Sequence, residues 1–151
     1  IRLMPNTPAQ VGEGMTGICY NERVTEEDLQ QILEITECFG KAEFVPERLM
    51  DAVVAVSGSS PAYVYMFVEA MADAAVSLGM PRKQAYAFAA QAVLGSAKMI
   101  LETGLHPGEL KDMVCSPAGT TIEGVRTLEK LGMRSAVYEA LCASAEKGRK
   151  L

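Results

Sequence analysis

Residues 115–125 form the segment of this sequence best suited to hold a small charged molecule. The run Cys-Ser-Pro-Ala-Gly-Thr-Thr-Ile-Glu-Gly-Val places a proline, two small residues and the pair Thr120 and Thr121 directly before an apolar helical pattern. The first turn of a helix carries free backbone N–H groups and the positive end of the helix dipole, which together attract an anion. A carboxylate or a phosphate is therefore the natural ligand, because the small residues let it approach the backbone.

The same segment also has a purely structural interpretation. Thr120 and Glu123 have the spacing of a capping box, in which two side chains bond the exposed N–H groups at a helix start. Thr120 would then do no more than begin a helix. The spacing alone leaves both interpretations open.

Other polar residues are explained without a ligand. The Ser-Gly-Ser-Ser-Pro run at 57–61 could line a pocket, but it predicts a tight corner between two helices, with Ser60 as the cap of the second. Glu47 and Asp51 lie one turn apart near a helix start, where carboxylates complement the dipole. His106 precedes a proline between two helices, so we expect it to cap a helix or lie at the surface.

Composition excludes several classes of function. The four cysteines have no C-x-x-C spacing and His106 is the only histidine, so no metal site is predicted. Fourteen basic against nineteen acidic residues give a net charge of −5, which disfavours a nucleic-acid partner. The most apolar stretch, 62–80, is interrupted by Glu69 and Asp73 and predicts a buried helix, not a membrane span. With no secretory signal at its start, the sequence predicts a cytoplasmic protein.

The elements that must position these residues are mainly helical. With 151 residues and an apolar fraction of 49%, the chain is long enough for one domain with a core. Two short strands are expected, one within 11–19 and one at 42–45, pairing with each other. Helix caps, first-turn prolines and terminal glycines predict helices over 25–40, 46–56, 61–79, 81–103, 107–114, 120–131 and 135–147.

The two longest predicted helices, 61–79 and 81–103, are rich in alanine and apolar on more than one face. Small side chains let helix axes approach closely, and a small domain has little interior in which to hide two such helices. The sequence therefore predicts an intertwined helical homodimer. The alternative is a monomer in which both helices form the core.

Several motifs of the chain have the order and spacing that are typical of one enzyme family. They are Met4-Pro5-Asn6-Thr7-Pro8, the run SGSSPAY at 57–63, Leu110-Lys111-Asp112, the run SPAGTTI at 116–122 and the run LEKLGMR at 128–134. On these motifs the whole chain resembles the pyrroline-5-carboxylate reductases. The resemblance implies the C-terminal part of an oxidoreductase that reduces 1-pyrroline-5-carboxylate to L-proline with NADPH or NADH, the last step of proline biosynthesis.

The resemblance also implies an architecture, a multi-helix dimerisation domain preceded by a short strand and loop from a Rossmann-type domain. Residues 1–8 would end an N-terminal dinucleotide-binding domain whose remainder is absent. Residues 9–151 would be the C-terminal helical dimerisation and substrate-binding domain. We then expect a homodimer or a higher oligomer, no membrane partner, and no activity from this chain alone.

Carried over position by position, the resemblance places substrate on the 116–121 loop. Backbone N–H groups of Ser116, Gly119 and Thr120 would hold the substrate carboxylate. Thr121 would be the catalytic residue, hydrogen-bonded to the ring nitrogen. Glu47 aligns with an acidic residue near substrate and cofactor, and is expected to bind substrate.

The cofactor would be bound mainly by the absent domain. Asn6 lies beside the expected nicotinamide pocket and is the one cofactor-binding residue assigned to this chain. Met113 stands where relatives have an asparagine that contacts the cofactor, which puts that contact in doubt.

Two other classes are alternatives to this family. One is the helical domain of a related imine reductase or β-hydroxyacid dehydrogenase, but Lys83 and Lys98 do not follow the glycine-rich pattern that surrounds a catalytic lysine there. The other is a helical dimerisation module with no catalytic role.

Overall fold

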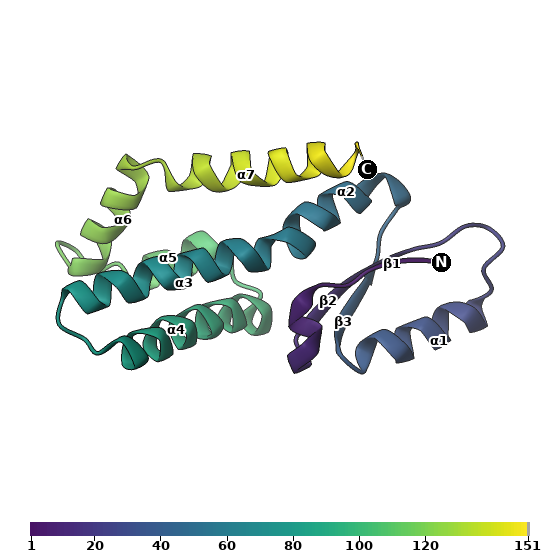
Figure 1. Cartoon of the computed structure of the whole chain (residues 1–151), viewed down its shortest axis with the longest axis horizontal. Helices are drawn as coiled ribbons and strands as arrows, with labels where there is room; N and C mark the ends of the chain where they lie inside the picture. The colour runs from purple at the N-terminus through teal and green to yellow at the C-terminus, as the bar shows by residue number, and fades with distance from the viewer. Residues whose placement is uncertain (151) are drawn as a thin grey trace. The chain divides into compact units, whose positions relative to one another are not determined.

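Figure 1 shows the computed structural model, which describes residues 1–150. Its elements are β1 (Arg2–Met4), η1 (Thr7–Val11), β2 (Gly14–Cys19), α1 (Glu26–Glu37), β3 (Gly40–Phe44), η2 (Glu47–Leu49), α2 (Met50–Val53), a π-helical segment (Val54–Ser59), α3 (Ser60–Ser77), α4 (Arg82–Thr103), α5 (Pro107–Met113), α6 (Thr120–Lys130) and α7 (Met133–Gly148). The mainly α fold class predicted from the sequence is confirmed. Within residues 1–150, no helix combines the length and the apolar character needed to cross a membrane.

The chain divides into two compact units, residues 1–63 with 137–150, and residues 64–136. In the first unit β1 pairs antiparallel with β2, and β2 pairs parallel with β3, with α1 connecting the two parallel strands. The predicted pairing of the second and third strands is confirmed. The residues on both sides of Pro8 belong to this unit, in which β1 is hydrogen-bonded to β2.

Local signals explain how α1 and β3 begin. Thr25 and Asp28 form a capping box: the Asp28 N–H donates to Thr25 Oγ1 at 3.2 Å, and the Thr25 N–H donates to Asp28 Oδ2 at 2.9 Å. Gly40 begins β3 with a φ of 154°. A Cβ at Gly40 would overlap the backbone of Gly14, so only glycine permits this strand pairing.

The corner predicted at residues 57–61 is wrong. The helical path continues from η2 through α2 and the π-helical segment into α3, and Ser60 has helical dihedrals (φ −63°, ψ −23°). Pro61 therefore lies inside a helix, where it lacks an N–H and crowds the carbonyl four residues earlier. The wider π turn just before Pro61 accommodates both effects. The hydroxyl of Ser60 donates back to Val56 O at 2.5 Å instead of capping a new helix.

The second unit has little interior of its own. Within residues 64–136, all of which the structure describes, the only buried residues are Ala72, Ala85 and Ala89. Several large apolar side chains of this unit are more than half exposed: Tyr65, Met66, Leu78, Phe88, Leu94, Leu101, Met113, Val114 and Leu131. So large an exposed apolar surface indicates that these helices are covered by something else.

Candidate functional site

Residues 116–119 make a tight turn directly before α6, and residues 120 and 121 are the first two of that helix. The Gly119 N–H donates to Ser116 O at 3.0 Å, and Ala118 has a φ of 55°. Among residues 1–150, Ala118 is the only non-glycine residue with positive φ. A Cβ at Gly119 would overlap Ser116 Oγ, so a larger residue there would force the Ser116 hydroxyl to move. Strain of this kind is concentrated at functional sites.

Of the two interpretations left open for Thr120, the capping box does not form. The N-cap of α6 is Gly119 (φ −79°, ψ 171°), and Thr120 is already the first helical residue. Glu123 instead accepts from Arg126 Nε at 2.8 and 2.9 Å. No side chain caps the first turn of α6. Its N–H groups, beside the exposed hydroxyls of Thr120 and Thr121, therefore have the arrangement that binds a carboxylate.

His106 caps α5, which is one of the two roles expected for it from the sequence. It is the N-cap residue, and its Nδ1 accepts from the Gly108 N–H at 3.0 Å. The side chain therefore bonds the start of the helix. Among residues 1–150 the structure gives it no partner that would make it a general acid or base.

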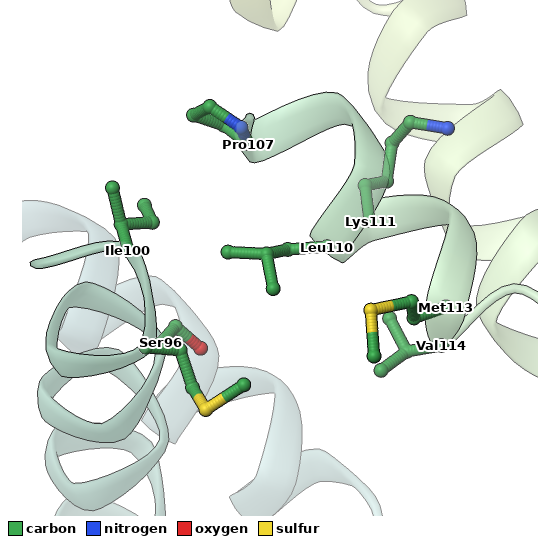
Figure 2. Close-up of a pocket in the computed structure, with 8 residues that line it drawn as sticks. Ser96, Ile100, Pro107, Leu110, Lys111, Met113 and Val114 are labelled. Carbon is green, nitrogen blue, oxygen red and sulfur yellow. The ribbon is translucent and has the colours of Figure 1, made fainter. Parts of the chain in front are cut away.

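A pocket of about 320 Å³ lies between α4 and α5 (Figure 2). In the view, Leu110 extends into it toward Ile100, whereas the Lys111 ammonium points away. Met113, which is 66% exposed, is among the residues that line it. A methionine offers no N–H donor, so the cofactor contact attributed to an asparagine at this position has no equivalent polar group here.

Glu47 lies in η2 and is bound by both neighbouring strands. Arg2 of β1 forms an ion pair with its carboxylate, and Cys19 of β2 donates from Sγ to Oε2 at 2.6 Å. The thiol hydrogen bond, then that of Arg2, holds the pKa of Glu47 below its ordinary value of 4.5. Burial, followed by the bond to Glu47, raises the pKa of Cys19, so the thiol stays protonated and donates.

We expect the stabilisation from this cluster to depend on pH. Because the pKa of Glu47 is lowered on folding, its contribution is complete above the ordinary carboxyl pKa and is lost as the pH falls through the lowered value. In urea unfolding, the stability difference between wild type and Glu47→Gln should therefore narrow as the pH falls from neutral into this range. Cys19→Ala should weaken this pH dependence, because the thiol is the largest cause of the shift. A difference that stays constant with pH would contradict the assignment.

Asn6 uses both ends of its side-chain amide within the first unit. Its Nδ2 donates to Ser57 O at 3.2 Å, and its Oδ1 accepts from the Met15 N–H at 2.9 Å. Asn6 thus connects the loop after β1 to the start of β2 and to the π-helical segment.

The expected site residues fall into two groups. Asn6 and Glu47 lie in the first unit, and Ser116, Gly119, Thr120 and Thr121 lie in the second. Sequence reasoning missed Arg2 and Cys19 as the partners of Glu47. These two residues face each other in the β1–β2 ladder, so a prediction of strand register would have placed them together. Among residues 1–150, no group of three potential ligands could hold a metal ion.

Comparisons with known proteins agree on one family. A family model described as "Pyrroline-5-carboxylate reductase dimerisation" matches residues 47–151. The chain is 65% identical over 151 residues to the pyrroline-5-carboxylate reductase of Escherichia coli, and 54% identical to that of Methanosarcina acetivorans. In both cases all of this chain is covered, and it spans 56% of the relative's length.

Two solved structures are similar over nearly the whole chain. The pyrroline-5-carboxylate reductase of Coxiella burnetii aligns with a TM-score of 0.94 at 35% identity, covering 99% of this chain and 56% of that one. The pyrroline carboxylate reductase of Plasmodium falciparum with NADP bound aligns with a TM-score of 0.90 at 36% identity, covering 96% and 58%. All four of these proteins are longer than this chain.

Proposed function

Because the chain belongs to the pyrroline-5-carboxylate reductase family, we propose that it is the dimerisation and substrate-binding part of an enzyme that reduces 1-pyrroline-5-carboxylate to L-proline with NAD(P)H. The observation that carries this proposal is the uncapped start of α6 behind the Ser116–Gly119 turn. It offers N–H groups and hydroxyls to a small anionic ring, without a metal or a basic side chain. The alternative of a β-hydroxyacid dehydrogenase is not supported, because neither Lys83 nor Lys98 lies in the glycine-rich pattern that surrounds the catalytic lysine of that family.

In the proposed site, the N–H groups at the start of α6 bind the substrate carboxylate, with Ser116, Gly119 and Thr120 shaping the turn around it. The helix dipole adds to this attraction. The Thr121 hydroxyl then bonds the ring nitrogen and orients the C=N bond. A protonated imine is already electrophilic, so correct positioning matters more than a strong acid. Thr121 is thus the proposed catalytic residue, acting by orientation.

NAD(P)H, when bound, supplies the hydride that reduces the C=N bond. The described residues do not fit the dinucleotide itself. A dinucleotide site needs a glycine-rich turn between a strand and the following helix, whereas the β2–α1 connection, residues 20–25, reads Tyr-Asn-Glu-Arg-Val-Thr. We therefore place most of the cofactor site in a further domain of the complete enzyme.

Two features support a division of the chain near Pro46 in place of the expected one at Pro8. The match to the dimerisation family begins at residue 47, where η2 begins. The sheet and α1 lie before that point. In our proposal they belong with the cofactor-binding part, and the helices from η2 onward form the homodimer. The four cysteines are free thiols, which suits the proposed cytoplasmic location.

The proposal predicts that activity requires more than this chain. The complete enzyme should oxidise NADPH or NADH in the presence of 1-pyrroline-5-carboxylate and release L-proline. This chain alone should give no oxidation above a substrate-free blank, because it lacks a dinucleotide site. The two rates are compared by cofactor absorbance at equal protein concentration. An inactive complete enzyme would contradict the function, and turnover by this chain alone would contradict the division of roles.

A further inference from the structure

Pro61 creates a hydrogen-bonding problem inside the continuous helical path from α2 to α3. In an α-helix, the N–H of residue 61 would donate to Ser57 O. Proline has no N–H and crowds that carbonyl. A part-buried carbonyl without a donor is destabilising, so a partner is expected from elsewhere in the chain.

Two side chains donate to carbonyls of this turn. Ser60 Oγ donates to Val56 O at 2.5 Å, the bond that a serine commonly makes to the carbonyl four residues earlier in a helix. Asn6 Nδ2 donates to Ser57 O at 3.2 Å, and Asn6 is 51 residues away along the chain. The amide of Asn6 therefore takes the place of the main-chain donor that Pro61 removes.

The other end of the Asn6 amide is also fixed. Its Oδ1 accepts from the Met15 N–H, next to the first residue of β2. Met4, two residues before Asn6, lies against the same segment, since a Cβ at Gly58 would come within 2.8 Å of Met4 Cε. The loop after β1 is thus seated on the π-helical segment by a packing contact and a hydrogen bond.

We propose that Asn6 is a positioning residue that replaces the helix hydrogen bond lost at Pro61 and so fixes the sheet against the helix leading into the dimerisation domain. For the reaction, this inference rests on the proposed function. Asn6 then acts through Ser57 and Met15, and not as the cofactor ligand that the family resemblance implies. Loss of this contact would loosen the hold of the sheet on the π-helical segment, both of which lie in the first unit.

A double-mutant cycle between Asn6 and Pro61 tests the contact in this chain, independently of any activity. Asn6→Ala should lower the folding equilibrium constant about tenfold in urea unfolding at fixed protein concentration. In a Pro61→Ala background the alanine supplies a main-chain N–H that can donate to Ser57 O. There, Asn6→Ala should lower the folding equilibrium constant by less than about threefold. Asn6→Asp, which keeps an acceptor for Met15 but removes the donor, should show the same rescue.

The matched control is Asn21→Ala. Asn21 Oδ1 accepts from the Arg23 N–H at 3.0 Å in an exposed turn. Asn21→Ala should therefore lower the folding equilibrium constant by the same factor with Pro61 and with Pro61→Ala. Equal losses for Asn6→Ala with and without Pro61 would overturn the proposal. If the Pro61→Ala chain fails to fold, the test is amide hydrogen exchange in the Asn6→Ala and Asn6→Asp variants. Exchange should accelerate at Met15, whose N–H loses its acceptor in Asn6→Ala but not in Asn6→Asp, and unchanged exchange would overturn the proposal.

Kinetics of the complete enzyme separate positioning from cofactor binding. As a positioning residue, Asn6→Ala should lower kcat about tenfold and leave the KM for NADPH within about twofold, with kcat partly restored by Pro61→Ala. A KM for NADPH that rises without rescue would show a cofactor ligand and overturn the positioning role. If the complete enzyme is inactive, the proposed function fails, and the unfolding cycle still decides whether Asn6 replaces the lost bond.

Discussion

Replacing both Met66 and Phe88 with aspartate should convert the proposed homodimer of this chain to a monomer at micromolar concentration. The two side chains lie on α3 and α4 and are 67% and 69% exposed in the single chain. Burying each at a subunit interface contributes about 1.5–3 kcal/mol. Losing both contributions removes about 3–6 kcal/mol per subunit, which raises the dimer dissociation constant by at least about a hundredfold, and burying the introduced carboxylates opposes association further.

The matched control for this dimer prediction is Ile35→Asp on α1. Ile35 is also an exposed apolar side chain, at 57%, but it lies outside the residues that match the dimerisation family. Light scattering across micromolar concentrations should give the dimer mass for wild type and Ile35→Asp, and the monomer mass for the double variant. Circular dichroism confirms that helices remain. A dimer that survives the double substitution would place the interface elsewhere, and a monomeric wild type would refute the homodimer.

The sequence predicted helix ends where the deciding signal is local. Gly79 and Gly104 end the two long helices in the left-handed region, with φ values of 97° and 66°, which glycine adopts freely. The capping boxes show the limit of such signals. Thr25 and Thr120 begin the same pattern, a threonine followed three residues later by an acidic residue. Only Thr25 is extended (φ −88°, ψ 162°), whereas before α6 the extended residue is Gly119.

The difference between these two helix starts has a physical cause. The Pro117-Ala118 turn, with Ala118 in the left-handed region, brings the chain into the helix one residue early. Thr120 then has helical dihedrals and does not occupy the cap position. A spacing rule contains no information about this turn. The absence of a capping box at Thr120 and the uncapped start of α6 are therefore consequences of the same backbone geometry.

The remaining errors concern partners that are distant in sequence. Local patterns predict a corner at residues 57–61 because proline usually starts or ends a helix. The structure keeps Pro61 inside a helix because Asn6 supplies a donor from the loop after β1. Glu47 similarly depends on Cys19, which is 28 residues away. Such pairs follow from strand register and tertiary packing, which local patterns do not determine.

Thr121→Val in the complete enzyme should lower kcat/KM for 1-pyrroline-5-carboxylate about tenfold or more. Valine has the shape and β-branching of threonine, so the second position of α6 keeps its backbone, and the N–H groups proposed to bind the carboxylate remain. The proposed contact of the hydroxyl with the ring nitrogen is lost, which is worth about 1.5 kcal/mol, or roughly tenfold in rate. Since the hydroxyl is proposed to orient the C=N bond, most of the loss should be in kcat and not in the KM for substrate.

Two further variants show whether the Thr121 effect comes from the hydroxyl at that position. Thr121→Ser retains the hydroxyl, so its kcat/KM should stay within about threefold of wild type. Thr127→Val removes a hydroxyl from the same helix, where Oγ1 donates to Glu123 O at 3.0 Å inside the helix itself, so its kinetics should not change. Wild-type kinetics for Thr121→Val would remove Thr121 from the catalytic role and leave carboxylate binding to the backbone of α6. Equal losses for Thr121→Val and Thr127→Val would instead show that the helix, and not the hydroxyl, had been disturbed.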